Sequence, residues 1–238
     1  MNRHIVLTLG RSGSNTLCDM LNQHPEVYNI GEVLGSWTRF RKLQKFRLLP
    51  GGDEDYLDYV LYSDRFFQLT MAAQSANAIF NGRRNLTKSR NRIRTFGAKD
   101  FSLNFSRFGL DLYLHERDVK VIGLRRLSVP ARMLSNALLT HTGIVAVKDS
   151  TFKNRQIKID PNRITTMLAT IERENIELEK MLAALPPERC QTVEYEELFS
   201  SPDRRQLIMS GVFRFLGVEP ISVETTMNKI VTKPLNET

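Results

Sequence analysis

Short apolar runs alternate with amphipathic stretches along the chain, and this alternation predicts a sheet flanked by helices. Five runs are typical of strands and cover residues 4–9, 27–30, 96–99, 119–124 and 191–195. Amphipathic spacing predicts helices over residues 17–22, 55–80 with a break at 63–64, 128–138, 160–185 and 201–216. Strands that alternate with helices indicate a mostly parallel sheet covered by helices on both faces. We therefore expect an α/β fold in one domain over residues 1–238.

The later helices carry start signals and apolar stripes. Ser128, two residues before a proline, predicts an N-cap with proline in the first turn. After this cap, Ala131, Leu134 and Leu138 form the stripe that we expect to face the core. The longest helix follows, and its apolar residues have heptad spacing that Asn175 interrupts. Three heptads are too few to indicate a coiled coil, so we interpret this helix as part of the core.

The turn between the first strand and the first helix, residues 10–16, contains two glycines and four small polar residues that core packing does not require. A glycine-rich turn from strand into helix aims backbone N–H groups and the positive end of the helix dipole at one point, which suits a phosphate. Gly10 and Gly13 permit positive φ and close approach of the backbone, while Arg11 adds a forked positive side chain. The turn follows a strand of an α/β pattern, where ligands usually bind.

Two alternatives compete with binding of a phosphate-bearing ligand at this turn. In one, the turn is a simple cap with Ser14 or Asn15 as the N-cap of the helix. In the other, it belongs to a P-loop nucleotide kinase, whose loop ends in Gly-Lys-Ser/Thr. Gly13, Ser14 and Asn15 occupy that place here, so the lysine that holds the β- and γ-phosphates is missing. This absence counts against a kinase, which stays the alternative enzyme.

Residues 11–16, followed by a helix and residues 22–25 (Asn-Gln-His-Pro), resemble the 5′-phosphosulfate loop of sulfotransferases. The likeness is closest to the bacterial and carbohydrate-type branch, which has Arg-Ser-Gly-Ser/Thr where cytosolic relatives have Lys-Ser-Gly-Thr. The resemblance implies a P-loop-type nucleotide-binding fold, 3′-phosphoadenosine 5′-phosphosulfate (PAPS) as the donor, and no metal. It also implies that the loop holds the 5′-phosphosulfate through Arg11, Ser12, Gly13, Ser14, Asn15 and Thr16.

A second charged motif follows the strand at residues 119–124. Arg125 and Arg126 come directly after this strand, and Ser135 lies in the second turn of the next helix. The arrangement resembles the sulfotransferase 3′-phosphate motif, in which an arginine gives a bidentate contact and a serine hydroxyl donates a further hydrogen bond. The spacing is nine residues where many relatives have eight, and Leu127 holds the position eight before the serine. The resemblance implies that Arg126 and Ser135 bind the 3′-phosphate, with Arg125 as a substitute for Arg126. The alternative to 3′-phosphate binding is that the two arginines are solvated charges at the end of the strand.

The resemblance also supplies a candidate base, since in-line sulfuryl transfer needs a group that accepts the acceptor's proton. Glu32 matches the Gly-Glu element after the second strand of the bacterial and carbohydrate enzymes, where this glutamate is the proposed base. Alternatively, Glu32 is a surface carboxylate paired with Arg39 or Arg41. Arg11 completes the implied catalytic set. Lys99, at the end of its strand, is either a contact to the sulfuryl oxygens or an ordinary strand-end lysine.

The resemblance does not cover residues 36–95, where we expect acceptor specificity. This region is basic over residues 39–47 and 83–94, which indicates solvated loops, a surface for an acidic glycan, or a nucleic-acid surface. Nucleic acid is the least favoured, because the stretches match no nucleic-acid-binding fold. A non-catalytic module that binds anions or nucleic acid is thus the second alternative. Near the C-terminus, residues 195–198 resemble a structural segment of the family, and Lys229 and Lys233 are candidate nucleotide contacts.

The composition indicates which partner and which cellular location to expect. The formal charge of +8 predicts an anionic partner. The two cysteines, Cys18 and Cys190, make neither a disulfide framework nor a metal site. The chain has no apolar run of membrane-spanning length and no leader-like segment, so we expect a cytoplasmic protein. The expected function is sulfuryl transfer from PAPS to a hydroxyl or amine acceptor, such as a carbohydrate.

Overall fold

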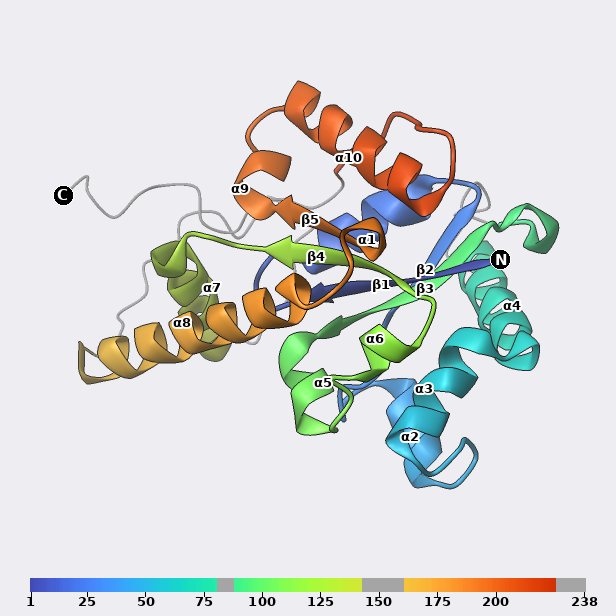
Figure 1. Ribbon diagram of the computed structural model, residues 1–238, viewed down its shortest axis with the longest axis horizontal. Helices are drawn as coiled ribbons and strands as arrows, with labels where there is room; N and C mark the ends of the chain where they lie inside the picture. Colours follow the sequence, from blue (N-terminus) through green and yellow to red (C-terminus); the bar gives the residue numbers. More distant parts are fainter. Residues whose placement is uncertain (81–87, 143–160, 226–238) are drawn as a thin grey trace.

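The computed structural model describes residues 1–80, 88–142 and 161–225, in which five parallel strands form a sheet with helices on both faces (Figure 1). The strands are β1 (Asn2–Thr8), β2 (Val27–Glu32), β3 (Thr95–Phe101), β4 (Lys120–Arg125) and β5 (Cys190–Glu194). Their order across the sheet is β2-β3-β1-β4-β5. The expected α/β fold with a parallel sheet is therefore confirmed.

Ten helices are found in the described residues. They are α1 (Ser14–Gln23), α2 (Arg39–Lys45), α3 (Asp53–Tyr62), α4 (Asp64–Phe80), α5 (Ser102–Arg107), α6 (Tyr113–Glu116), α7 (Val129–Thr142), α8 (Pro161–Ala183), α9 (Tyr195–Leu198) and α10 (Pro202–Leu216). Short 3-10 turns occupy Arg90–Arg92 and Pro187–Arg189. The predicted break near residue 63 is confirmed, because α3 ends and α4 begins there.

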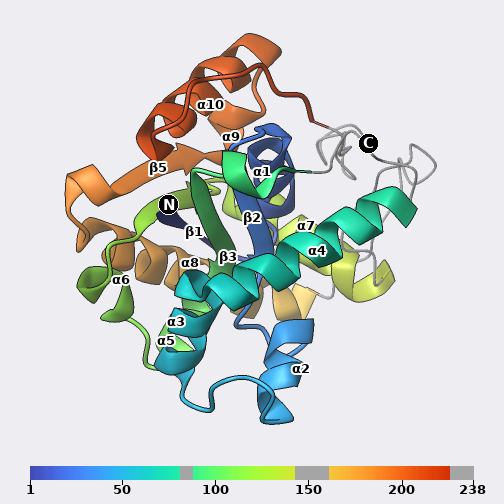
Figure 2. The same cartoon turned by 90° about the vertical axis from the view of Figure 1, so that its right-hand side faces the viewer.

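Alternate residues of the central strand face two separate cores. Ile5 and Leu7 belong to the core that contains residues of α3, α4, α5, α6 and α8. Val6 belongs to the other core, which includes residues of α1, α9 and α10. Figures 1 and 2 show the two groups of helices on opposite sides of the sheet. Because both faces are covered, residues 5–7 of β1 are apolar in succession and do not alternate with polar residues.

Helix α7 turns a different face to the core from the one its sequence predicts. Ala131 and Leu134 are only half-buried, whereas Arg132 and Met133 are buried. The Leu138 side chain lies outside the described residues. The predicted stripe is wrong at Ala131 and Leu134, because the neighbouring Arg132 directs its guanidinium into the fold, where it pairs with Glu174.

The basic stretch 39–47 contains a helix, α2, and one of its arginines is a core residue. Arg41 is 5% exposed, pairs with Asp53 at 2.6 Å and lies 4.2 Å from the centre of the Phe108 ring.

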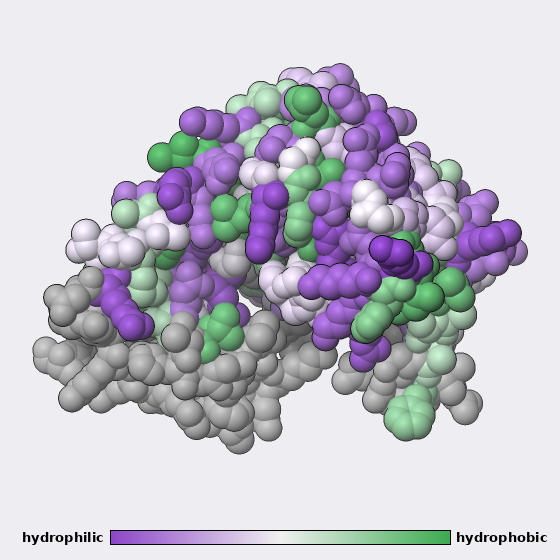
Figure 3. Space-filling view, turned by 90° about the horizontal axis from the view of Figure 1, so that it is seen from below, coloured by the Kyte–Doolittle hydropathy of each residue, from purple (hydrophilic) through white to green (hydrophobic). Residues whose placement is uncertain are grey.

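On the face seen in Figure 3, hydrophilic side chains surround smaller hydrophobic groups. The predicted basic residues Arg83 and Arg84, like Lys229 and Lys233, lie outside the described residues.

His4 of β1 makes stability depend on pH. Asn29 Nδ2 donates to the Nε2 atom of this buried ring at 3.1 Å, and Nδ1 lies 2.9 Å from the Thr95 hydroxyl. Burial lowers the pKa of His4 to about 3. The unfolded chain binds this proton below about pH 6.5, so stability falls as the pH falls through that value. The loss at pH 5 is about 2 kcal/mol.

Urea unfolding between pH 8 and pH 5 measures this loss, and His4→Gln provides the comparison. The variant is expected to lose less stability than the wild type over this interval, because carboxylates contribute equally to both curves. Parallel curves for the two proteins would contradict the assignment of the loss to His4.

Candidate functional site

The turn after β1 leads into α1 with Gly13 as the N-cap, at φ 80°, and no side chain caps this end. The alternative that Ser14 or Asn15 is the cap is therefore wrong, since both are the first residues of the helix. The expected positive φ is found at Gly13 but not at Gly10, because Arg11 takes the left-handed conformation instead, at φ 65°. An uncapped helix N-terminus of this kind is suited to an anion.

Side chains from other elements hold the backbone of this turn. Arg126 Nη1 donates to the Arg11 carbonyl at 2.6 Å, and Arg132 Nε donates to the Gly10 carbonyl at 2.9 Å. The Ser12 hydroxyl is buried and donates to the Leu9 carbonyl at 2.5 Å. A left-handed non-glycine residue costs about 1–3 kcal/mol, so it persists only when its surroundings fix it. The Ser12 hydroxyl is therefore engaged within the turn, and the predicted contact of Ser12 with an anion is that of its amide.

The two charged motifs meet at one edge of the sheet, as the sequence predicts. Arg11 Nε donates to the Ser135 hydroxyl at 2.9 Å, which joins the turn after β1 to helix α7. The Arg126 guanidinium lies 4.4 Å from the centre of the Tyr195 ring. Burial and the nearby charge of Arg126 lower the pKa of Arg11. Two neighbouring guanidinium groups repel each other, and an anion placed between them relieves that repulsion.

Arg125 and Arg126 are adjacent in sequence but have different hydrogen-bond partners. Arg125 bonds both carboxylate oxygens of Glu179 at 3.0 Å and Glu194 at 2.7 Å, so it ties β4 to α8 and β5. Arg126 instead faces the turn, where its Nη1 donates to the Arg11 carbonyl. The Nε atoms of both arginines are buried without a hydrogen-bond partner in the described residues, and of the two only Arg126 lies at the turn, where a phosphate oxygen would satisfy such a donor. The residues therefore fit a phosphorylated nucleotide at Arg126, and the predicted substitute Arg125 has a structural role.

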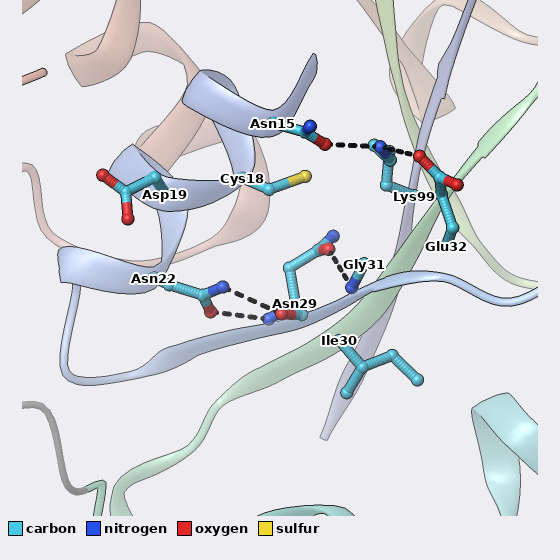
Figure 4. A pocket seen from close by; sticks show the side chains of 9 residues that line it. All are labelled: Asn15, Cys18, Asp19, Asn22, Asn29, Ile30, Gly31, Glu32 and Lys99. Carbon is cyan, nitrogen blue, oxygen red and sulfur yellow. Dashed lines mark hydrogen bonds and ion pairs between the residues drawn. The ribbon is translucent and has the colours of Figure 1, made fainter. Parts of the chain in front are cut away.

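A β-bulge places Glu32 opposite a buried lysine. The register of β2 against β3 shifts between Asn29 and Glu32, and Gly31 at φ 77° absorbs the extra residue. Lys99, which is 2% exposed, donates to Glu32 Oε1 at 2.5 Å and to Asn15 Oδ1 at 2.8 Å. The candidate base is thus linked through one ammonium group to the first turn of α1, as Figure 4 shows.

Glu32 has different partners from those that the surface alternative proposed. Its second oxygen accepts a hydrogen bond from Trp37 Nε1 at 2.6 Å, while Arg41 pairs with Asp53. No ion pair joins Glu32 to Arg39 or Arg41 in the described residues. The Trp37 ring is 57% exposed and lies beside the carboxylate. The alternative of a surface ion pair with these arginines is therefore wrong.

Three residues near the site carry contacts that the sequence did not predict. Buried Asp100 accepts hydrogen bonds from the N–H groups of Val33 and Leu34 at 2.9 and 2.6 Å, and so fixes the segment after Glu32. Tyr195 packs on Gly13, where an added Cβ would lie 2.6 Å from its ring.

Arg132 is the third, and it connects the turn to α8. Besides the Gly10 carbonyl, it donates to Asn175 Oδ1 at 3.1 Å and pairs with Glu174. Asn175 interrupts the heptad spacing of α8, and that interruption is the signal that could have revealed a buried polar partner on this face.

A pocket of about 420 Å³ opens between α1 and the end of β2 (Figure 4). Its lining comes from α1, β2 and β3 and comprises Asn15, Cys18, Asp19, Asn22, Asn29, Ile30, Gly31, Glu32 and Lys99. The pocket therefore touches both the turn after β1 and the candidate base. Burial raises the pKa of the Cys18 thiol to about 12, so this thiol is not a nucleophile at neutral pH.

Over the described residues, no helix combines the length and apolar character needed to cross a membrane. The same residues hold no cluster of three or more histidine, cysteine or acidic side chains that could bind a metal ion.

Comparison with solved structures identifies the fold. The crystal structure of a sulfotransferase from Alicyclobacillus acidocaldarius is similar at a TM-score of 0.53 and 16% identity, over 98% of this chain and 87% of that one. A sulfotransferase domain from the curacin biosynthetic pathway gives a TM-score of 0.47 at 16% identity, covering 99% and 81%. A sugar kinase from Janibacter sp. HTCC2649 gives only 0.36 at 14% identity, covering 94% and 99%.

The chain thus has a sulfotransferase-type α/β fold. No family model matches the sequence, and no curated protein matches it.

Proposed function

We propose that the protein is a PAPS-dependent sulfotransferase that acts on a hydroxyl or amine acceptor. The observation that carries this proposal is the hydrogen bond from Arg11 to Ser135, together with that from Arg126 to the Arg11 carbonyl. These contacts bring the side chains suited to the 5′ and 3′ ends of one nucleotide into a single cluster. The sulfotransferase-type fold supports the same function.

The donor would be held by two groups of residues. Arg11 and the amides of Ser12, Gly13, Ser14 and Asn15 suit the 5′-phosphosulfate. The Thr16 N–H, which the resemblance also implied, already donates to the Gly13 carbonyl at 3.0 Å. Arg126 and Ser135 suit the 3′-phosphate, because the Arg126 guanidinium lies at the turn after β1 and the Ser135 hydroxyl lies beside Arg11. No metal has a part in this proposal, and the charge comes from the two arginines and the helix terminus.

Glu32 is the proposed base. The acceptor oxygen bonds to sulfur as the bond between sulfur and the bridging phosphate oxygen of the donor breaks, and Glu32 takes the acceptor's proton. The departing phosphate carries the negative charge, which Arg11 and the α1 amides stabilise. Lys99 lies between Glu32 and Asn15, where its ammonium group can meet the sulfuryl oxygens. The cytoplasmic location stays a prediction.

A nucleotide-binding measurement tests this function. Adenosine 3′,5′-bisphosphate (PAP) is expected to raise the melting temperature, with about 2.7 kcal/mol of stabilisation at a hundredfold its Kd. ATP is expected to stabilise the protein far less, because it lacks a 3′-phosphate. Equal shifts would favour a nucleotide kinase, and no shift from either would favour a non-catalytic module.

The variant Arg126→Ala sharpens this measurement. We expect it to abolish the preference for PAP over ATP, since the partner of the 3′-phosphate is removed. Arg39→Ala is the matched control, because it deletes an equal charge from the exposed face of α2 and should keep the preference. An unchanged preference in Arg126→Ala would contradict the assignment of this arginine.

A further inference from the structure

Helix α2 departs from the usual division of residues on a surface helix. Arg41 is buried and pairs with Asp53, whereas Leu43 and the C-cap residue Phe46 are exposed, Phe46 by 76%. These two apolar residues are three positions apart, so they lie on one side of the helix. Surface helices normally direct their apolar side inward and their charges outward. The stability of the fold therefore does not account for the apolar residues on this outer side.

The exposed apolar residues are interspersed with basic ones in the last turn of α2 and just after it. We call the exposed residues of this segment the α2 patch, and its members are Lys42, Leu43, Lys45, Phe46, Arg47 and Leu48. In the part of the chain that the structure describes, no ion pair joins the cations of the patch to an acidic residue. Helix α2 lies at the lower edge of Figure 1, and the view from below in Figure 3 shows hydrophobic side chains among hydrophilic ones. The patch is therefore both apolar and positively charged.

The acidic residues that follow the α2 patch in the sequence are engaged within the fold. Asp53 pairs with Arg41, and Glu54 pairs with Arg117, at 2.6 Å each. Asp55 lies in the first turn of α3, where the positive end of the helix dipole stabilises a carboxylate. The cations of the patch therefore dominate the charge of this surface.

The backbone at the end of α2 has a defined conformation. The Leu48 N–H donates to the Leu43 carbonyl at 3.1 Å, and the Arg47 N–H donates to the Gln44 carbonyl at 2.8 Å. These two bonds form a Schellman motif, in which the residue after the C-cap is left-handed and is usually glycine. Arg47 takes this position at φ 57°. The motif thus places a charged residue, at some cost in strain, between the exposed side chains of Phe46 and Leu48.

The buried side of α2 fixes the patch relative to the candidate site. The Thr38 hydroxyl accepts a hydrogen bond from the Arg41 N–H and donates one to the Val33 carbonyl, both at 3.2 Å. Val33 directly follows Glu32, and its N–H donates to Asp100 at 2.9 Å. A surface that binds the α2 patch therefore holds the pocket beside Glu32 in a defined orientation.

We propose that the α2 patch docks the protein on a membrane surface that contains anionic phospholipids. Phe46 and Leu48 enter the boundary between headgroups and acyl chains, while the cations meet the headgroup phosphates. A nucleic acid or an acidic glycan would engage the cations but leave the exposed leucines in water. The combination of apolar and basic side chains therefore favours a lipid surface. The inference does not depend on the proposed sulfotransferase function, because no residue of the patch belongs to the nucleotide cluster.

Sedimentation of the full chain with lipid vesicles tests this inference. Vesicles of phosphatidylcholine alone are compared with vesicles of phosphatidylcholine and phosphatidylglycerol in equal parts. We expect partitioning to the mixed vesicles to be stronger by about a hundredfold, and added salt should reduce the difference. Equal binding to the two kinds of vesicle, or binding to neither, would overturn the proposal.

The variant Leu48→Ser tests the apolar part of the patch. We expect it to weaken partitioning to the mixed vesicles by about tenfold, because an exposed leucine no longer enters the lipid. Leu207→Ser is the matched control, since Leu207 is an exposed leucine on α10, at the opposite edge of Figure 1, and its loss should leave partitioning unchanged. Equal partitioning of Leu48→Ser and the wild type would overturn the proposal.

The variant Lys45→Gln tests the basic part, and Lys180→Gln on α8 is its control. Both lysines are exposed, so the two variants lose the same charge from different surfaces. We expect Lys45→Gln to weaken partitioning about fivefold and Lys180→Gln to change it little. Equal losses would mean that the diffuse charge of the whole chain binds the vesicles, and would overturn the docking patch.

Two further measurements separate lipid docking from other causes. Thermal unfolding with PAP should give the same shift in Leu48→Ser as in the wild type, so a loss of vesicle binding would not reflect a loss of the fold or of the nucleotide site. Sedimentation velocity without lipid should show no change of oligomeric state in Leu48→Ser. If the wild type is a dimer that Leu48→Ser dissociates, the patch joins two copies of the chain and the lipid inference is wrong.

Discussion

Glu32→Gln is expected to lower kcat for sulfuryl transfer by about 10²–10⁴-fold while PAP still stabilises the protein. Glutamine keeps the size of the side chain and one accepting oxygen, so the hydrogen bond from Lys99 can persist, whereas the NH2 group cannot accept the one from Trp37. It cannot accept the proton that leaves the acceptor hydroxyl. The loss should therefore fall on turnover and not on nucleotide binding. Single-turnover rates with labelled PAPS and thermal shifts with PAP measure the two quantities separately.

Glu172→Gln is the control for this experiment, because Glu172 is exposed on α8. It makes the same chemical change away from the pocket and should leave kcat unaltered. Normal turnover in Glu32→Gln would move the base to another residue. A loss of PAP binding in Glu32→Gln would mean that the substitution disturbs the turn through Lys99 and Asn15, so the kinetic result would not identify a base.

Gly97→Ala is expected to destabilise the protein by about 3 kcal/mol or more. Gly97 lies on β3 opposite His4 of β1 in the register, and a Cβ atom there would lie 2.0 Å from the His4 carbonyl oxygen and 2.6 Å from its ring. The carbonyl belongs to the backbone of the central strand, so it cannot rotate away. The pair β1–β3 would have to separate locally. Urea unfolding at pH 8 measures the change.

The matched control for Gly97→Ala is Gly51→Ala. Gly51 is exposed in the loop before α3, and an added Cβ there meets no atom within 4 Å. Its free energy of unfolding should stay close to that of the wild type. Equal stability of Gly97→Ala and the wild type would show that β1 and β3 can separate without loss, and would contradict the close packing at His4.

The sequence predicts the elements of this fold better than their arrangement. All five strands are found where apolar runs predict them, because a strand buried on both faces has a distinctive local composition. The order β2-β3-β1-β4-β5 depends on contacts between distant segments, which local patterns do not encode. The stripe on α7 was misplaced for the same reason. Arg132 is buried by Glu174 and Asn175, and both lie on another helix.

The residues of the candidate site could likewise be predicted only in part from the sequence. The turn at residues 10–16 and the nearness of Arg126 to it follow from motif and strand position, and the structure brings these residues together. Lys99 is different, because its pairing with Glu32 depends on the β-bulge at Gly31, which only the register of two strands defines. The assignment of catalytic and donor-binding roles stays a prediction until the variants are measured.

The position of β3 between β2 and β1 constrains how the chain matures on the ribosome. β1 and β2 are synthesised first but do not pair with each other, and both pair with β3. A nascent chain that ends before Thr95 therefore carries two apolar strands whose facing edges are open. Open edges invite association between chains, so chaperone protection matters most while residues 33–94 are being translated.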